Sequence, residues 1–168
     1  MKPINNLEGL FIELLKNRYD SEQQQIEAFP EIMEEASSVA LKNAIQTSIN
    51  RSEIHFKKIV KIFNKLRVDP VDDVCEGCLV MINDAWKLIR KAGNKEIKDA
   101  ALITAIQHIH HYDIAGYGTL SAYAIILGYD EIAHELHEML DEEKSLDKIL
   151  KEVALESVNK KANNETMV

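Results

Sequence analysis

Residues that can end a helix are scarce in this sequence. Its 168 residues include 6 glycines and 3 prolines, too few to separate a series of short strands by tight turns. Apolar residues instead recur every three or four positions over long stretches, which is the spacing of one face of an α-helix. Four such stretches predict an all-α fold: Asn6 to about Ala36, about Ser38 to Leu66, about Lys95 to Leu127, and Asp130 to about Val158.

The connections between these stretches indicate how the helices pair. Only a few residues join the first helix to the second and the third to the fourth, so each pair should form an antiparallel hairpin. Residues 68–94 form a longer connection with a shorter helical pattern of its own. We therefore expect residues 1–158 to form a four-helix bundle of two hairpins joined by a crossover that contains a short helix. Residues 159–168 are polar, and we expect them to be a disordered tail.

Charge and hydropathy argue against several classes of partner. The chain has 20 Lys and Arg against 28 Asp and Glu, a formal net charge of −8, which repels nucleic-acid backbones and anionic lipid surfaces. No stretch approaches the roughly 20 apolar residues that span a bilayer, and the N-terminus lacks the apolar run of a signal peptide. Two cysteines are too few for a secreted disulfide framework. We expect a cytoplasmic protein that binds neither nucleic acid nor membrane.

Ionisable side chains interrupt every apolar stripe near the middle of its helix. Buried carboxylates lose their hydration and repel one another, so they must be protonated, paired with cations or bound to a metal. Carboxylates and imidazoles from facing helices are the ligands of the di-iron and di-manganese bundle proteins. The competing interpretation of each residue is a solvated helix edge or a hydrogen-bonded core histidine. The first-choice metal ligands are Glu22, His55, Asp113 and Glu143, and the second-choice ligands are His110 and Asp147.

Three stretches of the sequence resemble a known family. They are Leu7 to Ala28, Asp99 to Leu120, and Leu140 to Lys144 followed by Asp147. Together they are similar to the YciF-type ferritin-like family of bacteria, and the resemblance covers nearly the whole chain. It implies a ferritin-like four-helix bundle that is commonly dimeric, is associated with stress responses and has no established reaction.

The resemblance also implies which positions would hold metal. Glu22 and Glu143 match acidic positions of the family directly, and Asp147 matches in some members. Two further positions that are usually Glu carry other ligand types here, Asp113 and His110. In addition, His55 stands at a position that is usually Gln.

Arg51 departs from the family pattern, because a Glu is expected at its position on the second helix. If Arg51 turns inward, its ion pairs neutralise the carboxylates and no metal is needed. If it turns outward, His55 replaces it as the ligand from this helix. The first case predicts a non-enzymatic stress-associated scaffold with a degenerate site closed by Arg51. The second predicts an iron- or manganese-binding protein that oxidises Fe(II) or consumes peroxide, so that its substrate is a metal ion or a small oxidant.

Two other features allow more than one interpretation. Cys75 and Cys78 have the spacing of half a zinc site or of a redox pair, but the sequence contains no second pair. A homodimer is expected, since a bundle of this length often exposes one broad apolar face. The residues that could form this face, or equally belong to the core, are Met81, Trp86, Tyr117 and Tyr123.

Overall fold

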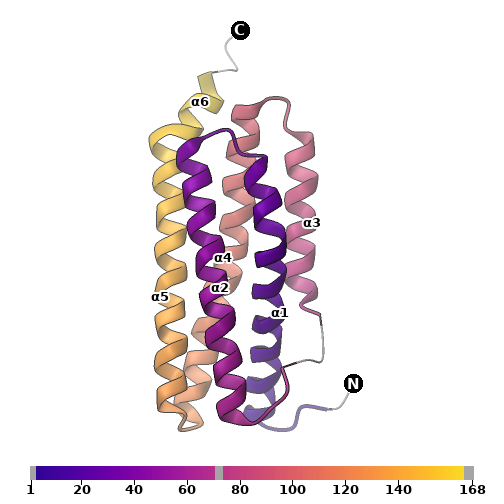
Figure 1. The fold of residues 1–168 in the computed structure, drawn as a ribbon, viewed down its shortest axis with the longest axis vertical. Helices are drawn as coiled ribbons and strands as arrows, with labels where there is room; N and C mark the ends of the chain where they lie inside the picture. The colour runs from indigo at the N-terminus through magenta and orange to yellow at the C-terminus, as the bar shows by residue number, and fades with distance from the viewer. Residues whose placement is uncertain (1–2, 71–73, 165–168) are drawn as a thin grey trace.

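Helices account for all of the regular secondary structure in the described part of the chain, residues 3–70 and 74–164 of a computed structural model (Figure 1). The all-α class predicted from the sequence is therefore confirmed. The elements in chain order are α1 (Leu7–Glu34), α2 (Val39–Leu66), α3 (Glu76–Lys91), α4 (Lys95–Ile126), α5 (Asp130–Val153), a π-helical turn (Ala154–Val158) and α6 (Asn159–Asn164).

Polar side chains just before the long helices fix where these begin. Asn6 accepts a hydrogen bond from the backbone N–H of Gly9, at 2.7 Å, and caps α1. Asn94 caps α4 in the same way, 2.8 Å from the backbone nitrogen of Ile97. Such caps satisfy backbone donors that have no partner inside the helix. Gly128 follows α4 with a φ of 77°, a left-handed conformation that glycine adopts without steric cost.

The four long helices run side by side along the length of the molecule (Figure 1). α1 packs against α2, and α4 packs against α5. α2 also contacts α5, and α1 contacts α4, so the four helices surround one interior. α3 packs on the outside of α4 and α1. Side chains from all four long helices can therefore meet on the axis between them.

Asp99 on α4 holds the connection between α1 and α2. Its carboxylate accepts hydrogen bonds from the Ser37 backbone nitrogen and hydroxyl, both at 2.7 Å, and from the Ser38 backbone nitrogen at 3.0 Å. Because Asp99 is buried, D99A should lower the free energy of unfolding by about 2–3 kcal/mol, as measured by urea denaturation. D84A, which removes an exposed carboxylate, should change it by less than about 0.5 kcal/mol. Equal effects of the two substitutions would contradict this role.

The end of the chain differs from the expected disordered tail. Residues 159–164 form α6, which contacts α4, and Ala162 is buried. The π-helical turn before α6 adds a residue to the helical repeat, and Val158 and Ala162 both lie against the bundle. Residues 165–168 of the expected tail lie outside the described residues.

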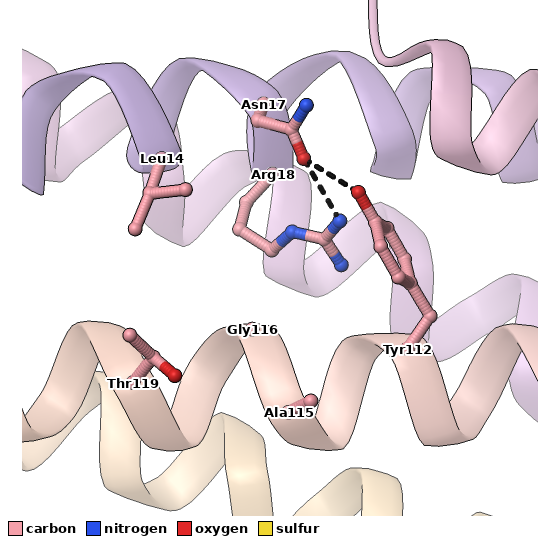
Figure 2. A pocket seen from close by; sticks show the side chains of 7 residues that line it. All are labelled: Leu14, Asn17, Arg18, Tyr112, Ala115, Gly116 and Thr119. Atoms are coloured by element: carbon pink, nitrogen blue, oxygen red, sulfur yellow. Dashed lines mark hydrogen bonds between the residues drawn. The ribbon is translucent and has the colours of Figure 1, made fainter. Parts of the chain in front are cut away.

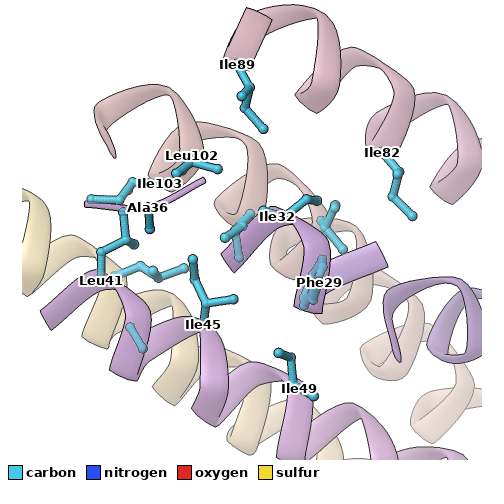
Figure 3. Close-up of a cluster of buried hydrophobic side chains, with 14 of the residues drawn as sticks. Phe29, Ile32, Ala36, Leu41, Ile45, Ile49, Ile82, Ile89, Leu102 and Ile103 are labelled. Atoms are coloured by element: carbon cyan, nitrogen blue, oxygen red, sulfur yellow. The ribbon is translucent and has the colours of Figure 1, made fainter. Parts of the chain in front are cut away.

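Two apolar clusters fill the interior on either side of the middle of the bundle. One is built around Phe29, Ile45 and Leu102 (Figure 3), and the other around Phe11 and Phe63. In each long helix, the positions between the two clusters carry most of the buried polar residues, and Asp99 and Ser121 of α4 lie outside this region. The interior is therefore apolar at both ends and polar at mid-length.

The four side chains considered for a dimer face lie in or against this core. Tyr117 is fully buried. Met81 and Trp86 are partly buried against the first apolar cluster, and Tyr123 against the second. The core interpretation therefore holds for Tyr117, and the other three contribute to the core with part of their surface.

Candidate metal centre

Five of the six predicted ligands meet at the centre of the bundle. Each is no more than 2% exposed. Ligand atoms of the first group, Glu22, His55 and Glu143, lie within 4.8 Å of one another, and so do those of the second group, His110, Asp113 and Glu143. Glu143 belongs to both groups, which are called the first and second triads below.

Asp147 lies beside this centre and belongs to neither triad. It accepts hydrogen bonds from Gln107 at 2.9 Å and from Lys151 at 2.5 Å. His111 also contacts this carboxylate, with its Nε2 3.2 Å from Asp147 Oδ1. The exposed ammonium of Lys151 and its neighbours therefore already supply Asp147 with positive charge and donors.

The first triad contains buried polar atoms without hydrogen bonds. His55 Nδ1 lies 3.3 Å from Glu143 Oε1 and 3.5 Å from Glu22 Oε1, yet it has no hydrogen-bond partner in the described structure, and neither has Glu22 Oε2. The other edge of each side chain is held: Tyr117 donates its hydroxyl proton to Glu22 Oε1, and His55 Nε2 lies 2.7 Å from Glu142 Oε2. Unpaired buried polar atoms are costly, so a ligand between these side chains would stabilise them.

The polar atoms of the second triad are already paired. The guanidinium of Arg18 forms a buried ion pair with Asp113 Oδ1, and Gln25 donates to Asp113 Oδ2 at 2.8 Å. His110 Nδ1 lies 2.6 Å from Glu143 Oε2, and its Nε2 lies 3.0 Å from Ser48 Oγ. Arg18 therefore occupies, as a permanent cation, the place beside Asp113 where a metal ion would otherwise be needed.

Arg51 follows neither sequence-based interpretation completely. Its side chain is 32% exposed and pairs with Glu142 at 2.8 Å, at the edge of the centre. Glu142 in turn contacts His55. Arg51 thus reaches the centre only through Glu142, and the buried arginine of this protein is Arg18.

Sequence reasoning missed three buried residues that shape this centre. Arg18 and Gln25 occupy the same stripe of α1 as Glu22, and Tyr117 occupies the stripe of α4 that carries Asp113. The signal was available, since helical spacing places all three on the inward faces. The sequence predicts Tyr117 only as a dimer-face or core residue, and the inward positions of Arg18 and Gln25 alone predict no role for them.

Burial and neighbouring charges shift the pKa values of these groups in opposite directions. Burial alone would lower the pKa of His55, but Glu143 and Glu22 raise it to about 10. The pKa of His110 is likewise raised, against its burial, by Glu143. For Glu143, burial would raise the pKa, but the two histidines lower it to about 2. Burial raises the pKa of Asp113 to about 7, with Arg18 opposing the shift.

The centre contains equal numbers of acidic and basic groups without a metal. Three carboxylates, on Glu22, Asp113 and Glu143, face Arg18 and the imidazoles of His55 and His110, so the charges balance when all six groups are ionised. One divalent cation that displaced the two imidazole protons would leave the total charge unchanged. Two divalent cations would leave an excess positive charge in a dry interior, which is costly.

Comparisons with known proteins place this arrangement in a family. Residues 6–163 match the family described as a domain of unknown function, DUF892. The chain belongs to the DUF892 family. Protein YciF of Escherichia coli (strain K12) is 33% identical to it over 164 residues, which are 96% of this chain and 98% of that protein. The family resemblance drawn from the sequence is therefore confirmed.

Two solved structures share the fold of this chain. The crystal structure of the E. coli stress protein YciF matches with a TM-score of 0.88 and 32% identity over 93% of this chain and 99% of that one. YcfI from Rhodopseudomonas palustris, described as a candidate structural protein, matches with a TM-score of 0.86 and 30% identity over 89% of this chain and 96% of that one. In this DUF892 chain, none of the described helices is long and apolar enough to cross a membrane.

Proposed function

We propose that this chain is a ferritin-like four-helix bundle of the bacterial stress response that binds one divalent iron or manganese ion at the first triad. The observation that carries the proposal is the pair of unpartnered buried atoms, Glu22 Oε2 and His55 Nδ1, beside the carboxylate of Glu143. We place the protein in the cytoplasm, and we expect it to work as a homodimer because the family resemblance implies one.

The donor set of the first triad suits such an ion. Two carboxylates and one imidazole are ligands for borderline to hard divalent cations. A histidine that binds metal through one ring nitrogen usually donates its other N–H to a carboxylate, and Glu142 lies at hydrogen-bonding distance from His55 Nε2. The hydroxyl of Tyr117 similarly fixes Glu22 through Oε1 and leaves Oε2 free.

The geometry supports one ion rather than the dinuclear site typical of such bundles. The second triad shares Glu143 with the first, and its Asp113 is paired with Arg18. A bound iron ion would supply the chemistry of Fe(II) oxidation or peroxide consumption. The residues of the chain hold the ligands in place: Tyr117 orients Glu22, and His110 orients Glu143 through Oε2.

A second candidate function is a scaffold without metal. It is favoured by the buried ion pair between Arg18 and Asp113 and by the charge balance reached when both imidazoles are protonated. In this case the site is closed by Arg18 and by two protons, with Arg51 contributing only at the edge through Glu142.

A metal-binding titration distinguishes the two functions. Chelator-treated protein should bind one Mn²⁺ per chain in calorimetry or equilibrium dialysis, and E22Q should weaken that binding at least about tenfold. The matched control is E27Q, which changes an exposed Glu of the same helix and should bind like the parent. If the parent binds no Mn²⁺ and, under anaerobic conditions, no Fe²⁺, the scaffold function is supported instead.

A further inference from the structure

Cys75 and Cys78 lie together on the first turn of α3. Cys75 is the residue that caps this helix, and its sulfur accepts a hydrogen bond from the backbone nitrogen of Cys78 at 3.4 Å. Both are free thiols and both are buried. Two cysteines separated by two residues at a helix N-terminus have the arrangement of Cys-X-X-Cys redox pairs.

The surroundings of the two thiols differ. Cys75 Sγ lies 3.3 Å from both Asn17 Oδ1 and the Tyr112 hydroxyl, and 4.0 Å from Arg18 Nη2. This sulfur therefore lies beside a buried guanidinium and at the N-terminus of α3, and its thiol donates to Asn17 Oδ1. Cys78 instead donates to the Ser21 carbonyl oxygen at 3.8 Å, and burial raises its pKa to about 12. Cys75 is therefore the better nucleophile of the pair.

A pocket reaches the polar neighbours of Cys75. It has a volume of about 240 Å³ and lies between α1 and α4, with Asn17, Arg18 and Tyr112 in its wall (Figure 2). The side chains of all three also contact Cys75 Sγ. Tyr112 is partly exposed and contacts both the pocket and Cys75 Sγ, so a small molecule in the pocket reaches the sulfur only if the Tyr112 ring moves. The opposite wall includes Gly116, where an added Cβ would lie 3.0 Å from Arg18 Cδ.

We propose that Cys75 and Cys78 form a peroxide-sensitive dithiol that closes to a disulfide. The thiolate of Cys75 attacks one oxygen of a hydroperoxide, the O–O bond breaks, and Cys75 becomes a sulfenic acid while hydroxide, or an alkoxide, leaves and takes up a proton. The sulfur of Cys78 then attacks Cys75 Sγ, the S–O bond breaks, and water leaves with the thiol proton of Cys78. The two sulfurs together lose two electrons, and the peroxide gains them. A cellular dithiol restores the pair by exchange.

This dithiol does not depend on the proposed metal site, because its chemistry needs only the two sulfurs and the peroxide. It does share Arg18 with that site: one guanidinium nitrogen pairs with Asp113 and the other faces Cys75. The test is therefore made on chelator-treated protein, so that its result is independent of whether a metal binds.

The experiment treats the reduced, folded full chain with a small excess of hydrogen peroxide. The number of free thiols should fall from two to zero, and the intact mass should fall by two hydrogens. Dithiothreitol should restore both values. In C78S, Cys75 should instead stop at a sulfenic acid that dimedone traps, whereas in C75S the remaining thiol should react at least tenfold more slowly.

Several outcomes would overturn the proposal. Retention of both thiols in the folded parent, with reaction only after denaturation, would show that the pair is inaccessible. Oxidation of Cys78 at the same rate in C75S would show that the two thiols are not distinguished. Since either serine variant can fail to fold, the thiol count and mass of the parent decide the first point without them.

Discussion

Replacing Arg18 with methionine should cost the metal-free protein up to about 3–5 kcal/mol of unfolding free energy at about pH 8, because Asp113 must then either stay charged without its cation or take up a proton. The second triad would at the same time lose the group that fills it. We therefore expect R18M to bind two Mn²⁺ per chain where the parent binds one, and to regain part of its stability when Mn²⁺ is added. Urea denaturation with and without chelator gives the first quantity, and elemental analysis after dialysis gives the second.

Two variants test whether these effects come from the buried ion pair. R51M removes the half-exposed arginine that pairs with Glu142, so it should cost no more than about 1 kcal/mol and leave the number of bound ions unchanged. R18M/D113N removes both partners of the buried pair and should recover most of the lost stability while returning the ion count to one. If R18M is as stable as the parent, or if R51M alone changes the ion count, the role assigned to Arg18 is wrong.

The all-α class could be predicted from the sequence because helical period and caps are local signals. Asn6, Ser38 and Asn94 each precede an apolar stripe and cap the helix that follows. The helical end of the chain was less readable, since Asn159–Asn164 is polar and its burial depends on one alanine and on contact with α4. Propensity alone gives no information on such tertiary contacts.

The centre was only partly predictable, for a related reason. Periodicity indicates which face of a helix a residue occupies. That information predicts that Glu22, His55 and Glu143 face the interior, where the structure places them close together. It does not indicate which partner a buried ion finds. Asp147 lies on the predicted face, yet Lys151 one turn later already pairs with it. Arg18 also lies on that face, but only the three-dimensional arrangement shows that its guanidinium reaches Asp113.

The stability of the metal-free protein should fall as the pH rises from about 7.5 to about 10. The pKa of His55 is raised in the folded state to about 10, so its protonated form stabilises the fold fully below its unfolded pKa of about 6.5, and this contribution is lost as the pH rises through 10. At about 1.4 kcal/mol for each pH unit between the two pKa values, the loss from His55 alone is on the order of 3–5 kcal/mol. His110, whose pKa is also raised, adds to it in the same direction.

The unfolding free energy should be measured from about pH 7.5 upward. Below that pH the titration of Asp113, whose pKa is raised to about 7, would add to the change. H55Q should flatten the decline, whereas H137Q, which changes an exposed histidine of α5 paired with Asp141, should leave it intact. Saturating Mn²⁺ should also remove the part of the decline that comes from His55 if the ion binds His55, because that imidazole is then neutral at both pH values. A parent whose unfolding free energy is level across this range would mean that the imidazole of His55 carries no proton in the folded state, and the charge balance of the metal-free centre would then require another cation.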